Sequence, residues 1–138
     1  MGEIAASRDM VAKAVLYTRL ANIGLGVLKE HASQLSNTIK TNIRMEVASA
    51  CLAGLQRFLE GGAYNNLSDL LVISEKVHWF SDQEICVREL HRLKLELVRG
   101  NKRGVELKAK DWLNLCTEKN WKLEKSLAAR VLSAYNSC

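Results

Sequence analysis

The 138-residue chain contains no proline. Proline lacks a backbone N–H and breaks a helix when it lies in the helix interior, so a proline-free chain can form long, uninterrupted helices. Sandwiches and barrels of β-strands rarely do without proline in their turns. The absence of proline therefore favours an all-α fold.

Apolar residues recur at three- and four-residue steps through most of the chain, which is the spacing of one helix face. The clearest series lies within residues 36–62, where Ser36 is a candidate N-cap and Gly61 is a stop. Ser81-Asp82-Gln83-Glu84 has the spacing of a capping box and marks another helix start. We expect helices that begin near residues 7, 37, 66, 82, 105 and 121. The predicted fold class is all-α, a single-domain bundle of five or six helices with short connections.

The same spacing predicts which side chains point into the core. In the helix that begins near residue 37 they are Ile39, Ile43, Val47, Ala50, Cys51, Gly54, Leu55 and Phe58. In the two helices that follow they are Leu67, Leu70, Leu71, Val77, Cys86, Leu90, Leu93 and Leu97. In the last helix they are the apolar residues at four-residue steps, Leu123, Leu127, Val131 and Tyr135.

The first expected helix, near residues 7–31, is apolar on more than one stripe. Such a helix is largely surrounded by protein, so it either lies at the centre of the bundle or has one face buried by a second copy of the chain. Gly24 and Gly26 inside it indicate either a bend or a close helix crossing. The second alternative for this helix, a face buried by another chain, predicts a homodimer or another protein partner.

The length of the chain fits one domain over residues 1–138. No uninterrupted run of apolar residues approaches the roughly 20 residues that span a bilayer, so we expect no membrane span. The first residues lack the basic and apolar regions of a signal peptide, and the four cysteines show no close pairing. We therefore expect reduced thiols and a cytoplasmic or nuclear protein.

The net charge of +5 is unevenly distributed along the chain. Residues 1–62 carry +2, residues 63–98 carry −2 and residues 99–138 carry +5. A compact basic surface attracts polyanions, and contacts of lysine and arginine with phosphates provide most of the affinity in sequence-independent nucleic-acid binding. The basic C-terminal part at 99–138 can equally be a solvated face that keeps the protein soluble.

We expect a small helical protein that binds nucleic acid, with RNA favoured, either double-stranded or without sequence readout. No helix-turn-helix signature indicates reading of the DNA major groove. The glycine-flanked loop 99–104 could let backbone amides approach phosphates. The predicted nucleic-acid-binding residues are Arg99, Lys102, Arg103, Lys108, Lys110, Lys119, Lys122 and Lys125. The alternative is a non-enzymatic interaction or adapter module that uses the apolar first helix for dimer or partner binding.

No catalytic motif is present in the sequence, so no catalytic residue is predicted and we expect a protein that is not an enzyme. Cys86, His91 and Cys116 match no recurrent zinc spacing and no nucleophile pattern, so we expect no metal site and no cofactor. Among the three tryptophans, Trp121 is the best candidate for stacking on bases, because lysines flank it. The alternative for each tryptophan is a place in the core.

Overall fold

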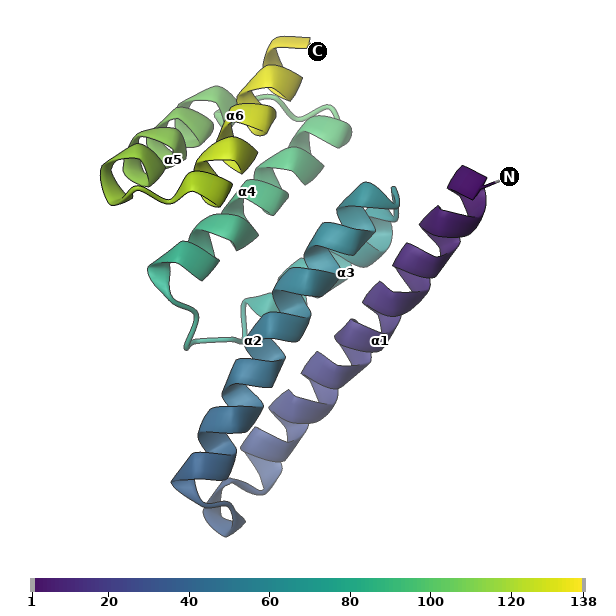
Figure 1. Ribbon diagram of the computed structural model, residues 1–138, viewed down its shortest axis with the longest axis vertical. Helices are drawn as coiled ribbons and strands as arrows, with labels where there is room; N and C mark the ends of the chain where they lie inside the picture. Colours follow the sequence, from purple (N-terminus) through teal and green to yellow (C-terminus); the bar gives the residue numbers. More distant parts are fainter. Residues whose placement is uncertain (1, 138) are drawn as a thin grey trace. The chain divides into compact units, whose positions relative to one another are not determined.

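The computed structural model describes the backbone of residues 2–137 and the side chains of residues 8–137. Over these residues the chain forms α-helices and one short 3-10 helix but no strand (Figure 1). The elements are α1 (Gly2–Glu30), η1 (Ala32–Gln34), α2 (Asn37–Glu60), α3 (Tyr64–Ser74), α4 (Asp82–Val98), α5 (Val105–Lys119) and α6 (Lys122–Ser137). The predicted all-α bundle of five or six helices with short connections is confirmed.

The helices form two compact units, one over residues 1–80 and one over residues 81–138. In the first unit α1 and α2 lie side by side and antiparallel, and α3 packs against both (Figure 1). In the second unit α4, α5 and α6 pack against one another. The prediction of one domain over residues 1–138 stays a prediction.

Two helices begin directly after the serines that the sequence predicts as N-caps. The side chain of Ser36 accepts a hydrogen bond from the Ile39 backbone N–H at 3.2 Å and caps α2. At the start of α4, the Glu84 N–H donates to the Ser81 hydroxyl at 3.2 Å, and the Ser81 N–H donates to the Glu84 carboxylate at 2.9 Å. This reciprocal pair is the predicted capping box, which satisfies backbone donors that have no partner within the helix.

Small residues bring α1 close to α2. Ala14 and Ala21 are fully buried on α1. A Cβ atom built on Gly24 would lie 2.3 Å from Val47 Cγ2, and α1 continues unbroken through this point. Of the two predicted explanations for Gly24, the close crossing is therefore correct. Gly26 has open space around the position of its missing Cβ.

Of the two alternatives predicted for α1, a place at the centre of the bundle is wrong. The buried apolar side chains of the first unit come mostly from α2, α3 and the segment after them, and include Val47, Ala48, Ala50, Cys51, Leu55, Phe58, Leu67, Leu70, Leu71, Val77 and Phe80. On α1, by contrast, Leu16, Leu20 and Ile23 are 57%, 56% and 63% exposed. The helix thus packs one face on α2 and leaves a second apolar face uncovered.

The stretch Arg8–Glu30 of α1 is long enough and apolar enough to cross a membrane by length and composition, with a mean hydropathy of 1.3 in its most apolar window. A count of uninterrupted apolar runs misses this stretch, because Lys13 and Arg19 interrupt it. Core helices and signal sequences can have the same composition, so this property alone assigns no membrane location.

The second unit has its own core, to which all three helices contribute. Its buried residues are Cys86, Leu90, Leu93, Leu97, Val105, Ala109, Cys116, Ala128 and Val131. The alternating stretch 105–110 is the start of α5, as predicted. The turn between α5 and α6 uses Asn120 in the left-handed conformation, with φ of 60°.

The predicted inward face of α6 is partly wrong. Leu123 is 82% exposed, whereas the buried residues are Glu124, Ala128 and Val131. A four-residue step turns a helix by about 400°, so residues at such steps drift by about 40° each time and leave the core face within two steps. The buried Glu124 carboxylate accepts a hydrogen bond from Gln83 Nε2 at 3.0 Å.

Three of the four cysteines are buried thiols, and Cys138 lies outside the described residues. Burial raises the pKa of Cys51 to about 11, and it also raises the pKa of Cys86 and of Cys116. The Sγ atoms of Cys86 and Cys116 are 3.5 Å apart. These thiols are therefore held in the protonated, unreactive form at neutral pH.

We expect Cys51, Cys86 and Cys116 to resist alkylation in the folded protein at about pH 8, because the thiolate is the reactive form and burial suppresses it. Maleimide labelling followed by peptide mass spectrometry should find label on these residues only after unfolding in denaturant. Rapid labelling of any of the three in the native protein would show that its helix packing is looser than the structure indicates.

Candidate functional site

The loop between α4 and α5 holds three of the predicted nucleic-acid-binding residues at the surface. Arg99 is the C-cap of α4, Lys102 and Arg103 follow it, and all three are exposed. Gly100 and Gly104 have φ angles of 81° and 76°, which glycine adopts without steric cost. The two glycines thus form the turns from which the cations project.

The start of α5 adds backbone donors beside these cations. Gly104 is the N-cap and has no side chain to accept the first N–H groups of the helix. Such N–H groups carry partial positive charge and favour an anion. Lys108, one turn further along α5, is also exposed. We call Arg99, Lys102, Arg103 and Lys108 the loop group.

Two of the predicted residues have partners within the protein. Lys110 forms an ion pair with Glu106. The hydrogen bond to Glu106 raises the pKa of Lys110, and the same bond lowers the pKa of Glu106. Lys102 Nζ lies 4.9 Å from the centroid of the Tyr135 ring, a cation–π contact. Because Glu106 offsets its charge, Lys110 belongs to no cationic group here.

The remaining predicted residues gather where α5 meets α6. Lys119 ends α5, Lys122 and Lys125 lie in the first turns of α6, and all three are exposed. Arg130, which was not among the predicted site residues, lies on the same exposed side of α6. Residues eight apart in a helix are within about 80° of each other, which would have related Arg130 to Lys122. We call Lys119, Lys122, Lys125 and Arg130 the α6 group.

Carboxylates are distributed differently on the two helices. On α5, Asp111 and Glu118 are exposed, so the outward side of this helix is mixed in charge. On α6, the one carboxylate is that of Glu124, which is buried against Gln83. Within the described part of the chain no ion pair involves the α6 group. The outward side of α6 is therefore the most consistently cationic helix surface of this unit.

The loop and the turn that joins α5 to α6 lie at opposite ends of α5. The helix has 15 residues, which corresponds to a length of about 21 Å. The contact of Lys102 with Tyr135 shows that the far end of α6 returns to the loop. The structure therefore does not bring the predicted residues into one site. Lys119, Lys122 and Lys125 lie at the opposite end of α5 from the loop, about 20 Å away, while Lys108 and Arg130 lie between the two ends.

All three tryptophans are half-buried. Trp112 and Trp121 are half-buried against the core of the second unit. Trp79, in the first unit, donates a hydrogen bond from its indole N–H to the Arg44 carbonyl at 2.7 Å. Trp121 is next to the α6 group in sequence, but much of its ring is used in packing.

The described residues offer no cluster of three histidines, cysteines or acids that could hold a metal ion. His91 donates from Nδ1 to the Val87 carbonyl at 2.8 Å, which occupies that nitrogen within its own helix.

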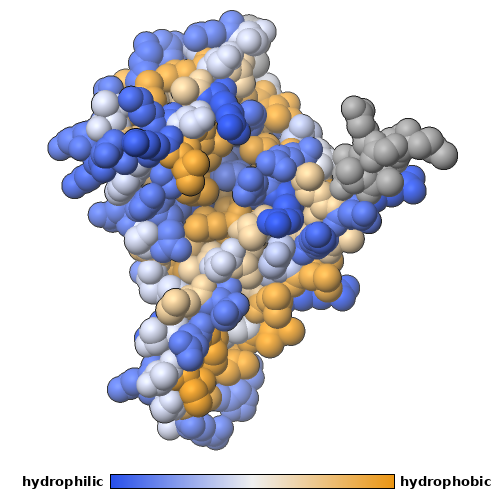
Figure 2. Space-filling model, viewed as in Figure 1, coloured by the Kyte–Doolittle hydropathy of each residue, from blue (hydrophilic) through white to orange (hydrophobic). Residues whose placement is uncertain are grey.

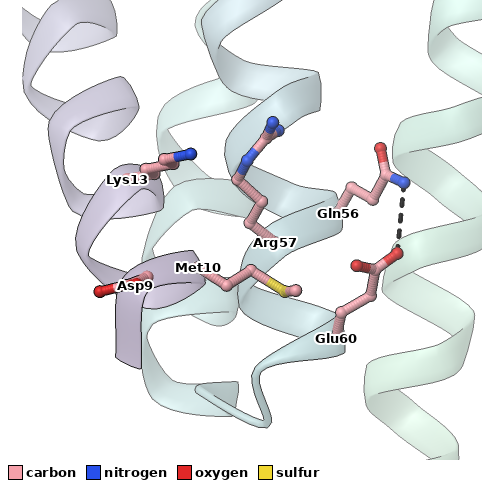
Figure 3. A pocket seen from close by; sticks show the side chains of 6 residues that line it. All are labelled: Asp9, Met10, Lys13, Gln56, Arg57 and Glu60. Atoms are coloured by element: carbon pink, nitrogen blue, oxygen red, sulfur yellow. Dashed lines mark hydrogen bonds between the residues drawn. The ribbon is translucent and has the colours of Figure 1, made fainter. Parts of the chain in front are cut away.

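A polar hollow of about 420 Å³ lies between α1 and α2 in the first unit (Figure 3), lined by Asp9, Met10, Lys13, Gln56, Arg57 and Glu60. Gln56 donates to Glu60 at 3.2 Å, and the Arg57 guanidinium lies 5.0 Å from the centroid of the Tyr17 ring. The two basic and two acidic side chains of the lining balance in charge, and the lining does not converge on a catalytic arrangement.

An apolar groove of about 320 Å³ lies elsewhere between α1 and α2. Its lining is Leu20, Ile23, Gly24 and Val27 from α1 and Asn42, Ile43, Glu46 and Val47 from α2. Figure 2 shows hydrophobic side chains gathered along α1 at the surface. Apolar surface of this kind, rimmed by polar residues, is typical of an interaction site.

Comparison with known protein families, with curated proteins and with solved structures found no match to this chain.

Proposed function

We propose that the chain binds nucleic acid, with RNA favoured, through contacts of its second unit with backbone phosphates. The observation that carries this proposal is the α6 group, four exposed cations with no ion pair among the described residues. Three of them, Lys122, Lys125 and Arg130, lie on α6, whose only carboxylate is the buried Glu124. Exposed lysines and arginines of this kind neutralise phosphates and release counterions, which provides affinity without sequence readout.

The arrangement of the cations supports recognition of the backbone and not of bases. The two ends of α5, where most of these cations lie, are about 20 Å apart, a distance that covers about six phosphates of one strand at the spacing of a DNA duplex. The tryptophans are at least partly engaged in packing, so they offer little free ring surface for stacking. Double-stranded RNA is recognised mostly by shape and backbone, which suits a helical surface that presents charge at two points.

Titration of labelled double-stranded RNA, single-stranded RNA and double-stranded DNA at about 50 and 200 mM salt tests this function. We expect binding to all three at low salt, with the highest affinity for double-stranded RNA, and a steep loss of affinity as the salt concentration rises. The absence of RNA binding at low salt would remove the proposal. Binding that is insensitive to salt would exclude phosphate contacts as its basis.

A further inference from the structure

The uncovered face of α1 has the spacing of a helix-pairing seam. Leu16, Leu20, Ile23 and Val27 follow one another at steps of four, three and four residues along its outward side. This 4-3-4 spacing is the a/d repeat with which two helices pack knobs into holes. The first three of these side chains are each more than half exposed, so the seam is uncovered within the unit.

The face of α1 beside the seam argues against a membrane as the cover of the seam. That face is packed closely on α2, where the missing side chain of Gly24 leaves room for Val47. On α2, Lys40, Arg44 and Glu46 lie within two turns of this crossing. A bilayer around α1 would have to accept these charged groups or separate the two helices, and either is unfavourable. A protein surface is the better match.

The charged residues at the two ends of the seam indicate which protein surface covers it. Lys13 lies three residues before Leu16, and Glu30 lies three residues after Val27, so the a/d repeat continues to one cation and one anion. Both of these charged side chains are exposed. Read in reverse, the seam is complementary to itself, because apolar residues meet apolar residues and the cation meets the anion.

We propose that a second copy of the chain packs antiparallel on this seam and forms a symmetric dimer. In this register Leu20 meets Ile23 of the partner subunit, Leu16 meets Val27 of the partner subunit, and Lys13 meets Glu30 of the partner subunit. A parallel, in-register pair would instead bring like charges together at both ends. A symmetric dimer repeats every contact, so each opposite-charge pair forms twice.

Two further features fit a helix in this position. The apolar groove extends from the seam onto α2, where Ile43 and Val47 line it, so a second helix would also contact α2. Gly26 lies in the interior of α1, where glycine is unfavourable relative to alanine. Nothing within the unit requires glycine there, because the position of its missing Cβ has open space around it. Beside the seam, a residue without a side chain permits close approach of the partner backbone.

Sedimentation equilibrium of the full chain at micromolar concentration tests the interface. We expect a mass twice the 15.5 kDa of one chain. Ile23→Glu should weaken dimerisation by roughly tenfold or more, because it places a carboxylate at the centre of the seam. The matched control is Leu123→Glu, a similar change at a leucine of α6 that is 82% exposed, and it should leave the dimer unchanged. A monomeric wild-type chain, or a dimer that survives Ile23→Glu, would overturn the proposal.

Charge reversal tests the orientation. Lys13→Glu alone and Glu30→Lys alone should each weaken the dimer by about fivefold, because two attractive pairs become repulsive. The double variant should restore wild-type affinity. Circular dichroism of all variants should show unchanged helix content, since the substituted side chains are exposed. If the double variant fails to recover, the antiparallel register is wrong.

Discussion

Leu55→Ala is expected to lower the free energy of unfolding by about 2–5 kcal/mol, the usual range for truncation of a buried leucine. Leu55 lies in α2 with no solvent exposure, among the residues that join α2 to the rest of the first unit. Truncation removes apolar area from the core and leaves a cavity that the surrounding helices fill only partly. Leu93→Ala makes the same test of the second unit, where Leu93 is 3% exposed.

Urea unfolding followed by circular dichroism measures both effects. Leu123→Ala is the matched control, because it makes the same chemical change at a leucine that is 82% exposed. Its cost should stay within about 0.5 kcal/mol. A cost below about 0.5 kcal/mol for Leu55→Ala or Leu93→Ala would mean that the inward face of the corresponding helix has been misplaced.

Local signals in the sequence are sufficient for the fold class and for the starts of several helices. Ser36 and Ser81 cap α2 and α4 through contacts within three residues of each serine, so no tertiary information is needed to find them. Most residues predicted to point inward in α2, α3 and α4 are buried. Ile39, in contrast, is 47% exposed.

The third helix shows where periodicity alone misleads. The sequence predicts a helix from about residue 66 to residue 80, whereas α3 covers Tyr64–Ser74. Val77 and Phe80 are buried as apolar residues of a helix would be, but they lie in an irregular segment. Burial requires only that a side chain reach the core. The backbone there is fixed by tertiary packing, which a pattern of apolar residues does not encode.

The sequence predicts which charges are available for binding but not how they are arranged. All eight predicted residues are exposed, yet α5 places the loop residues at one end and Lys119, Lys122 and Lys125 at the other. The neutralisation of Lys110 by Glu106 follows a four-residue spacing and could have been anticipated from the sequence. The cationic side of α6, including Arg130, depends on which face is buried, and the four-residue steps of its apolar residues indicate that face incorrectly.

Removal of two cations from either group is expected to weaken RNA binding and to lower the slope of log affinity against log salt by about two. The variants are Lys102→Ala with Arg103→Ala in the loop group, and Lys122→Ala with Lys125→Ala in the α6 group. Each substitution leaves about one phosphate without a protein cation, so the slope should fall by about one for each substituted side chain. Stability should change little, because these side chains are exposed.

Combining both pairs of changes should lower the slope by about four. Between about 50 and 200 mM salt, the affinity of this variant should then fall by roughly a hundredfold less than the affinity of the wild-type chain.

The control is Lys40→Ala with Arg44→Ala in α2, which removes the same net charge from the first unit as each double variant removes from the second. The Arg44 backbone carbonyl still accepts the Trp79 indole N–H in that variant, so packing there is retained. If RNA contacts both groups at once, the two slope changes add and the control has a much smaller effect. Equal losses of affinity from all three double variants would instead show that attraction by total charge, and not contact with the two groups, determines binding.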